Sequence, residues 1–88
     1  MIIVRGKRFT KSFKKRIENN FSLLSQFKKR WQLFTEDSSN PLLKDHSLKG
    51  SLLGFRSFSI TGDVRIIYKK EGETVNLFDI GSHNQVYK

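Results

Sequence analysis

The segment Gly62–Tyr68, GDVRIIY, constrains the fold more than any other part of the chain. Its residues alternate between two sets, and the run is rich in β-branched and aromatic side chains, as in a central strand. One set, Val64, Ile66 and Tyr68, is suited to a core. The other set contains Arg65, a cation in the middle of a strand, which normally requires an anionic partner. That partner is either a carboxylate of the protein or a substrate.

Two further strands are predicted next to this one. Phe55–Ile60 alternates in the same way before a Thr-Gly turn, and Thr74–Ile80 follows a Glu-Gly turn. Three hairpin-linked strands form an antiparallel meander. Ile2–Val4 is long enough for a short first strand. Leu42–Gly54 has no clean period and is predicted to be a loop with a short extended piece, and Gly81–Lys88 is predicted to be a polar tail.

Two amphipathic helices are predicted between the first strand and the meander, one capped by Thr10 and the other by Ser22. Their apolar residues recur at helical spacing, Phe9, Phe13 and Ile17 in the first and Leu24, Phe27, Trp31 and Phe34 in the second. Such stripes are typical of buried helix faces. The expected fold is therefore α+β, in the order β-α-α-β-β-β, with a twisted antiparallel sheet and both helices packed on one face. We expect residues 1–88 to form a single domain.

The net charge of +9 is concentrated at one end of the chain. Residues 1–34 contain ten Lys or Arg and one acidic residue, Glu18, whereas the remainder has equal numbers of basic and acidic residues. A polyanion or a strongly acidic protein is the expected partner, and a merely solvated helical face is the alternative. The absence of cysteine suits a reducing cytoplasm. No apolar run approaches the roughly 20 residues of a membrane span, so a cytoplasmic protein without membrane contact is predicted.

The C-terminal half contains a sparse polar set but no glycine-rich phosphate loop, metal-ligand cluster or nucleophile elbow. The set consists of His46, Lys49, Arg56, Asp63, Arg65, His83 and Tyr87. These residues lie in three runs, D-H-S-L-K-G-S-L-L-G-F-R, G-D-V-R-I-I-Y and I-G-S-H-N-Q-V-Y. In order and spacing the runs resemble the RelE/ParE superfamily of type II toxins, and most closely its YafQ-like branch. The resemblance spans Leu43–Lys88, and the preceding strand and basic helices agree with the fold order of the family.

The resemblance implies a metal-independent endoribonuclease without a cofactor. Such a toxin enters the ribosomal A site, cuts messenger RNA there, and is held inactive by a cognate antitoxin. For this chain we expect a monomer or a weak dimer. The implied catalytic residues are His46, Asp63, Arg65, His83 and Tyr87. Attack by a ribose 2′-hydroxyl requires a base, cationic donors for the phosphate and an acid for the leaving oxygen, and histidine and arginine can meet these needs.

The expected roles differ between these residues. Arg65 is expected to hold the scissile phosphate with help from Arg56 or Lys49. The proton transfers are assigned to His46 and His83 together, and either one can be the base. Tyr87 is expected to orient a nucleobase or a histidine. Four lysines of the helices are predicted to grip ribosomal RNA through sequence-independent phosphate contacts, namely Lys14, Lys15, Lys28 and Lys29.

The sequence departs from the YafQ-like pattern at two positions. Ser59 stands where a further histidine is usual, and Val64 stands where an aromatic residue is usual. Arg65, in contrast, matches the RelE-like branch.

Structural explanations of the same residues stay open. Arg65 can form an ion pair with Asp63 or Asp79, Asp63 can serve only the turn, and Tyr87 can simply pack the tail. Two other functions also stay open. A ParE-like inhibitor of DNA gyrase shares the fold but needs no proton-transfer set, and a small basic RNA-binding module is favoured only by the charge.

Overall fold

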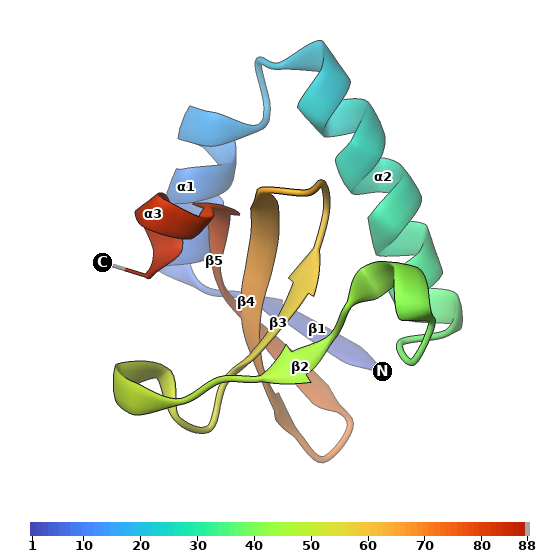
Figure 1. Ribbon diagram of the computed structural model, residues 1–88, viewed down its shortest axis with the longest axis vertical. Helices are drawn as coiled ribbons and strands as arrows, with labels where there is room; N and C mark the ends of the chain where they lie inside the picture. The colour runs from blue at the N-terminus through green and yellow to red at the C-terminus, as the bar shows by residue number, and fades with distance from the viewer. Residues whose placement is uncertain (88) are drawn as a thin grey trace.

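The computed structural model describes residues 1–87, which form one mixed five-stranded sheet with helices on both of its faces (Figure 1). The sheet order is β1-β5-β4-β3-β2. The strands are β1 (Ile2–Arg5), β2 (His46–Ser47), β3 (Arg56–Ser59), β4 (Val64–Glu71) and β5 (Thr74–Ser82). The predicted α+β class and the antiparallel meander of β3, β4 and β5 are confirmed. Strand β1 runs parallel to β5, so the sheet is mixed rather than wholly antiparallel.

The helices are α1 (Lys7–Arg16), α2 (Phe21–Glu36) and α3 (His83–Val86), with short 3-10 helices at Pro41–Leu43 and Gly50–Leu52. The predicted N-caps of the first two were wrong, because Thr10 and Ser22 lie inside α1 and α2. Gly6 precedes α1, where its N–H donates to the Leu77 carbonyl of β5. Asn20 caps α2 by accepting the Leu23 N–H at 3.1 Å. None of the described helices has the length and hydrophobicity to cross a membrane.

The main core lies between one face of the sheet, called the helix face below, and helices α1 and α2. The predicted strand alternation is confirmed there, since Phe58, Ile66 and Tyr68 all point into this core. Phe34 of α2 stacks on Phe58 of β3 with ring centroids 4.3 Å apart. A series of neighbouring aromatic rings, Phe9, Phe13, Phe27, Trp31 and Phe34, joins α1 to α2. The predicted apolar stripes therefore serve as the core.

The opposite face of the sheet, called the open face below, carries a smaller apolar cluster. Ile67 lies at its centre, and Leu48 and Val86 pack beside it. Val86 belongs to α3, in the segment predicted to be a polar tail. That helix begins with a capping box in which Ser82 accepts the Gln85 N–H and the Gln85 side chain accepts the Ser82 N–H. Helix α3 is thus fixed to the end of β5 (Figure 1).

Helix α1 continues along the edge of β5 beyond the end of β1 and is tied to it by a buried carboxylate. Asp79, whose side chain is 1% exposed, accepts from Arg8 Nε at 3.1 Å and lies 3.5 Å from Arg16 Nη1. Arg16 also donates to the Ile80 carbonyl at 2.9 Å. These contacts fix the end of α1 next to the start of α3.

We expect Gly6→Ala to lower the free energy of unfolding by about 1–3 kcal/mol, as overpacking does elsewhere. A Cβ at Gly6 would lie 2.9 Å from the Leu77 carbonyl oxygen, and neither backbone can retreat without breaking the contact between α1 and β5. Urea unfolding followed by circular dichroism measures the loss. Gly62→Ala is the matched control, because a Cβ there has no atom within 4 Å, and a loss equal to that of Gly6→Ala would refute the explanation.

Candidate active site

Four of the residues predicted to be catalytic come together where β4 begins and α3 follows β5. The guanidinium carbon of Arg65 lies 5.8 Å from the centroid of the Tyr87 ring. The Tyr87 ring in turn lies 4.6 Å from the His83 ring, at an angle of 59°. Asp63 joins the group by accepting the His83 backbone N–H at 3.3 Å. A cation, an imidazole and a carboxylate are therefore presented on adjacent elements.

Arg65 has no ion pair among residues 1–87. Its Nε donates to the backbone carbonyl of Asp63 at 3.4 Å, and the Asp63 carboxylate faces α3 instead. The alternative that Arg65 pairs with Asp63 or Asp79 is thus wrong, because Asp79 is taken by two arginines of α1. The cross-strand neighbours of Arg65 are Ser59 and Gly81, both small. The guanidinium is thus held in place without a carboxylate partner in the described part of the chain.

Asp63 does more than shape the turn between β3 and β4. The turn is made by the Thr61 hydroxyl, which accepts the backbone N–H groups of Asp63 and Val64 at 3.2 and 3.0 Å. The Asp63 carboxylate is left to hold the first residue of α3, which is His83. Asp63 therefore positions the backbone that carries the histidine.

Within residues 1–87, the Tyr87 side chain makes contacts through its ring. The hydroxyl is buried and has no hydrogen-bond partner within the described part of the chain, while the two ring contacts reach Arg65 and His83. A cation over an aromatic face contributes about 0.5–1 kcal/mol at an exposed site. The ring thus contacts both side chains, and its predicted role in orienting a histidine stays a prediction.

His46 lies on the same face of the sheet as Arg65 but at its far edge. It is paired with Ser57, which is paired in turn with Ile67 of the open face. Two strand spacings, or about 10 Å, separate β2 from β4. The imidazole is exposed, and its Nδ1 lies 2.9 Å from the Lys44 carbonyl oxygen. A substrate lying across β3 would have His46 on one side and Arg65 with His83 on the other.

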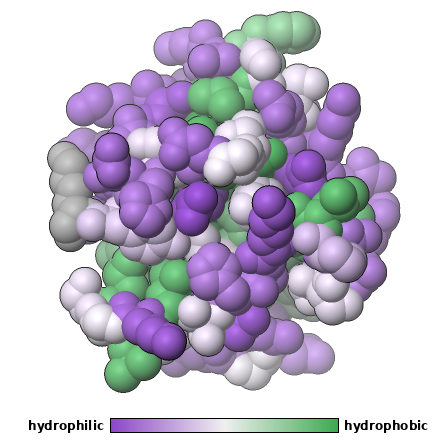
Figure 2. Space-filling view, in the orientation of Figure 1, coloured by the Kyte–Doolittle hydropathy of each residue, from purple (hydrophilic) through white to green (hydrophobic). Residues whose placement is uncertain are grey.

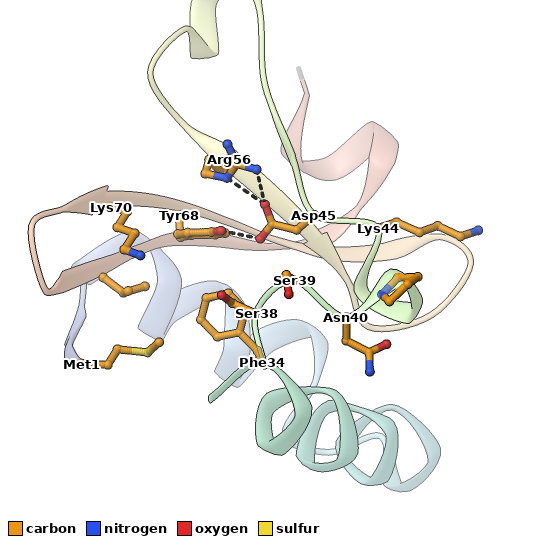
Figure 3. Close-up of a pocket in the computed structure, with 12 residues that line it drawn as sticks. Met1, Phe34, Ser38, Ser39, Asn40, Lys44, Asp45, Arg56, Tyr68 and Lys70 are labelled. Carbon is orange, nitrogen blue, oxygen red and sulfur yellow. Dashed lines mark hydrogen bonds and ion pairs between the residues drawn. The ribbon is translucent and has the colours of Figure 1, made fainter. Parts of the chain in front are cut away.

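The structure does not bring Arg56 to this site. Arg56 is paired with Tyr68 across the strands and so lies on the helix face, where Nε and Nη2 both donate to Asp45 Oδ1 at 2.7 Å. Lys49 is exposed just before the 3-10 helix Gly50–Leu52. The sequence interpretation missed Asp45 and Tyr68, which meet Arg56 at the edge of a cleft of about 530 Å³ (Figure 3). The alternation of residues along β3 and β4 could have predicted that Arg56 and Tyr68 lie on the same face of the sheet.

The four predicted RNA-binding lysines, Lys14, Lys15, Lys28 and Lys29, are all exposed on α1 and α2. Lys15 lies nearest the site, because it lines a cleft of about 410 Å³ together with Gly81 and Gln85. Hydrophilic side chains also dominate the visible surface between α3 and β2, and a hydrophobic patch stands at the lower left over the loop before β3 (Figure 2). Leu53, which is 76% exposed, belongs to that loop. The visible surface around the site is thus mainly hydrophilic.

The five-stranded mixed sheet, the two basic helices on it, and an arginine and a histidine that both contact the Tyr87 ring are the arrangement expected of a RelE-like toxin. The model of the family described as the bacterial toxin YafQ of type II toxin–antitoxin systems matches residues 1–88. The chain belongs to this YafQ family. No curated protein sequence matches it.

Solved structures of toxins share the fold. A metal-bound toxin from Helicobacter pylori is 33% identical, with 98% of each chain covered and a TM-score of 0.76. YafQ from Escherichia coli is 21% identical, covering 98% of this chain and 97% of that one at a TM-score of 0.77. The E. coli DinJ–YafQ complex gives 22% identity, the same coverage and a TM-score of 0.74. The metal belongs to the H. pylori protein; residues 1–87 here contain no group of three His, Cys, Asp or Glu side chains placed to hold one.

Proposed function

We propose that this toxin is an endoribonuclease that cleaves messenger RNA in the ribosomal A site without a metal ion. Arg65 holds the scissile phosphate, His46 and His83 carry the two proton transfers, and Tyr87 and Asp63 position His83. The reaction forms a bond between the ribose 2′-oxygen and phosphorus and breaks the bond from phosphorus to the 5′-oxygen. One imidazole takes the proton of the 2′-hydroxyl, and the other supplies a proton to the leaving oxygen.

The observation that carries this proposal is the unneutralised guanidinium of Arg65 beside His83. A structural arginine in a sheet would be expected to have a carboxylate partner. Within residues 1–87, Arg65 contacts a backbone carbonyl and an aromatic ring, which orient the charge and leave its hydrogen-bonding edge for a phosphate. Fixed positive charge of this kind is what a developing phosphorane charge requires.

The test is expression of the toxin in bacteria, followed by mapping of messenger RNA 5′ ends in the arrested cells. The expected result is new ends at codon boundaries within translated regions. Growth arrest with intact messenger RNA and inhibited DNA supercoiling would overturn the proposal in favour of a gyrase inhibitor. The same mapping with purified ribosomes and toxin establishes whether the ribosome is needed.

The four exposed lysines are expected to bind ribosomal RNA. Replacing Lys14, Lys15, Lys28 and Lys29 together by glutamate should weaken association with ribosomes and flatten its dependence on salt, since each phosphate contact releases counterions. Co-sedimentation with ribosomes at several salt concentrations measures both effects. The matched control is the pair Lys69 and Lys70 on β4, changed in the same way. Unchanged association in the fourfold variant would assign the basic charge to solubility.

An antitoxin is the second proposed partner, by analogy with the DinJ–YafQ complex. A groove of about 120 Å³ between α1 and α2 is suited to the apolar anchors of an amphipathic segment, and its lining is Arg5, Phe9, Phe13, Phe27, Trp31 and Leu77. The surrounding lysines and arginines favour acidic residues on that segment. Co-expression of the neighbouring open reading frame should therefore restore growth. Toxicity that no neighbouring product suppresses would contradict this partner.

A further inference from the structure

Asp45 is the centre of a polar network that crosses three strands on the helix face of the sheet. Its Oδ1 accepts from Nε and Nη2 of Arg56, both at 2.7 Å, and its Oδ2 accepts from the Tyr68 hydroxyl (Figure 3). The Asp45 side chain is 10% exposed. Burial and then the bond to Asp45 raise the pKa of the Tyr68 hydroxyl, so the hydroxyl stays protonated and remains a donor. The carboxylate is thus held by charged and neutral donors from two different strands.

This network holds a short segment at the edge of the sheet. Strand β2 is only two residues long, pairs with β3 alone and forms the edge of the sheet. Asp45 immediately precedes it, and alternation places the next side chain, His46, on the open face. The following apolar residue on that face, Leu48, is buried against Ile67. The position of His46 is therefore set by Asp45 on one side of the sheet and Leu48 on the other.

The same geometry selects one tautomer of His46. Its Nδ1 lies 2.9 Å from the Lys44 carbonyl oxygen, and because a carbonyl can only accept, the neutral ring carries its hydrogen on Nδ1. The lone pair is then on Nε2. Lys44 adopts a left-handed conformation with φ of 50°, between the fully buried Leu43 and the clamped Asp45. That backbone turn aims its carbonyl at the imidazole.

We propose that Asp45, Arg56 and Tyr68 are positioning residues that hold His46 in the tautomer with its hydrogen on Nδ1, so that Nε2 faces the open side of the sheet as a proton acceptor. The role of Nε2 as a base rests on the proposed nuclease function. The tautomer of His46 does not depend on that function. Arg56 accordingly acts through Asp45 and not on RNA, because Nε and Nη2 of its guanidinium hold Asp45 on the opposite face. His46 would be the base of the reaction and His83 the acid.

The test uses the intact toxin labelled with ¹⁵N in its histidines. Long-range ¹H–¹⁵N spectra at a pH where the rings are neutral distinguish the two tautomers of His46 and His83 separately. We expect His46 to carry its hydrogen on Nδ1 in the wild type and to become a mixture in Asp45→Asn, with His83 unchanged as the internal control. Tyr68→Phe, which keeps the ion pair and the ring packing, should give a smaller change in the same direction. It also carries the measurement if Asp45→Asn does not fold.

Cleavage kinetics give the second readout. Asp45→Asn should lower kcat about tenfold with KM unchanged, less than the roughly 100-fold that loss of a general base itself causes. Lys70→Gln, which changes another residue lining the same cleft, is the matched control and should leave both constants unchanged. A folded Asp45→Asn or Tyr68→Phe variant with the wild-type tautomer would overturn the proposal, as would an Arg56→Lys variant that raises KM alone. If Asp45→Asn changes the tautomer of His46 but the wild-type protein cuts no RNA, the positioning role of Asp45 is supported and the nuclease function is refuted.

Discussion

Replacing Arg65 by alanine should lower the rate of messenger RNA cleavage by about 100- to 1000-fold, which corresponds to about 2.7–4 kcal/mol of lost transition-state stabilisation. The guanidinium is anchored on β4 near the middle of the sheet and has no carboxylate partner among residues 1–87. Its removal deletes a fixed charge at the phosphate. The measurement is single-turnover cleavage on programmed ribosomes, over a range of pH, and the loss should persist at every pH because arginine does not titrate there.

The fold should survive this substitution. Arg65 is only partly buried, and its loss removes a contact with the Tyr87 ring that contributes about 0.5–1 kcal/mol. Arg65→Lys should recover part of the rate, since it keeps the charge but not the planar fork that matches a phosphate. Lys69→Ala removes a charge from the same strand and is the control. Full activity in a folded Arg65→Ala variant would refute the assignment of the phosphate site.

The periodic parts of the fold could be predicted because local sequence and burial agree in them. Phe58, Ile66 and Tyr68 occupy the face that alternation predicts, and the aromatic stripes of α1 and α2 lie in the core. The N-cap of α1 was not predictable from local preference, because Gly6 is required by the close approach of the Leu77 carbonyl, 71 residues away in the chain. A tertiary contact therefore decided where that helix begins.

Strand β2 was predicted only as a short extended piece within a loop, and helix α3 was not predicted at all, for different physical reasons. Strand β2 has only two residues, which is too short a run for alternation to predict a strand. It is fixed instead by the contacts of Asp45 with side chains of β3 and β4. Helix α3 did have a local signal, since Ser82 and Gln85 have the spacing of a capping box. Its four residues were too few to show a helical period. The buried Val86 shows that the segment is held by packing rather than by helix propensity.

The site divides in the same way. The motif order led to Arg65, Asp63, His83 and Tyr87, and the structure places these four together. Arg56 was grouped with them as a phosphate ligand. However, Arg56 and Phe58 are two residues apart in β3 and therefore lie on the same, core-facing side of the strand. Strand alternation thus contained the information needed to place Arg56 and Arg65 on opposite faces of the sheet. It could not predict that Asp45 is the partner of Arg56, because Asp45 reaches Arg56 only once β2 has paired with β3.

Asp79→Asn should lower the free energy of unfolding by about 3 kcal/mol, near the lower end for breaking a buried ion pair because Arg8 is 54% exposed and partly screened. The amide keeps the size of the side chain and leaves one oxygen to accept the Ile80 N–H. It removes the charge that faces Arg8 and Arg16. Urea unfolding measures the change, and it should largely persist at high salt, because a buried pair is screened less than an exposed one.

The control for Asp79→Asn is Glu73→Gln. Glu73 is an exposed acidic residue just before β5, and its substitution should change the free energy of unfolding by less than about 0.5 kcal/mol.

The size of the Asp79 effect decides between two physical accounts of this buried carboxylate. If desolvation of Asp79 cancels its attraction to the two arginines, the loss will fall below about 1 kcal/mol. If the attraction is larger than the desolvation cost, Asp79→Asn will also loosen the end of α1 from β5. Lys15 will then move away from Gly81 and the start of α3. Ribosome binding and cleavage should then decline together in Asp79→Asn, whereas Arg65→Ala lowers cleavage alone.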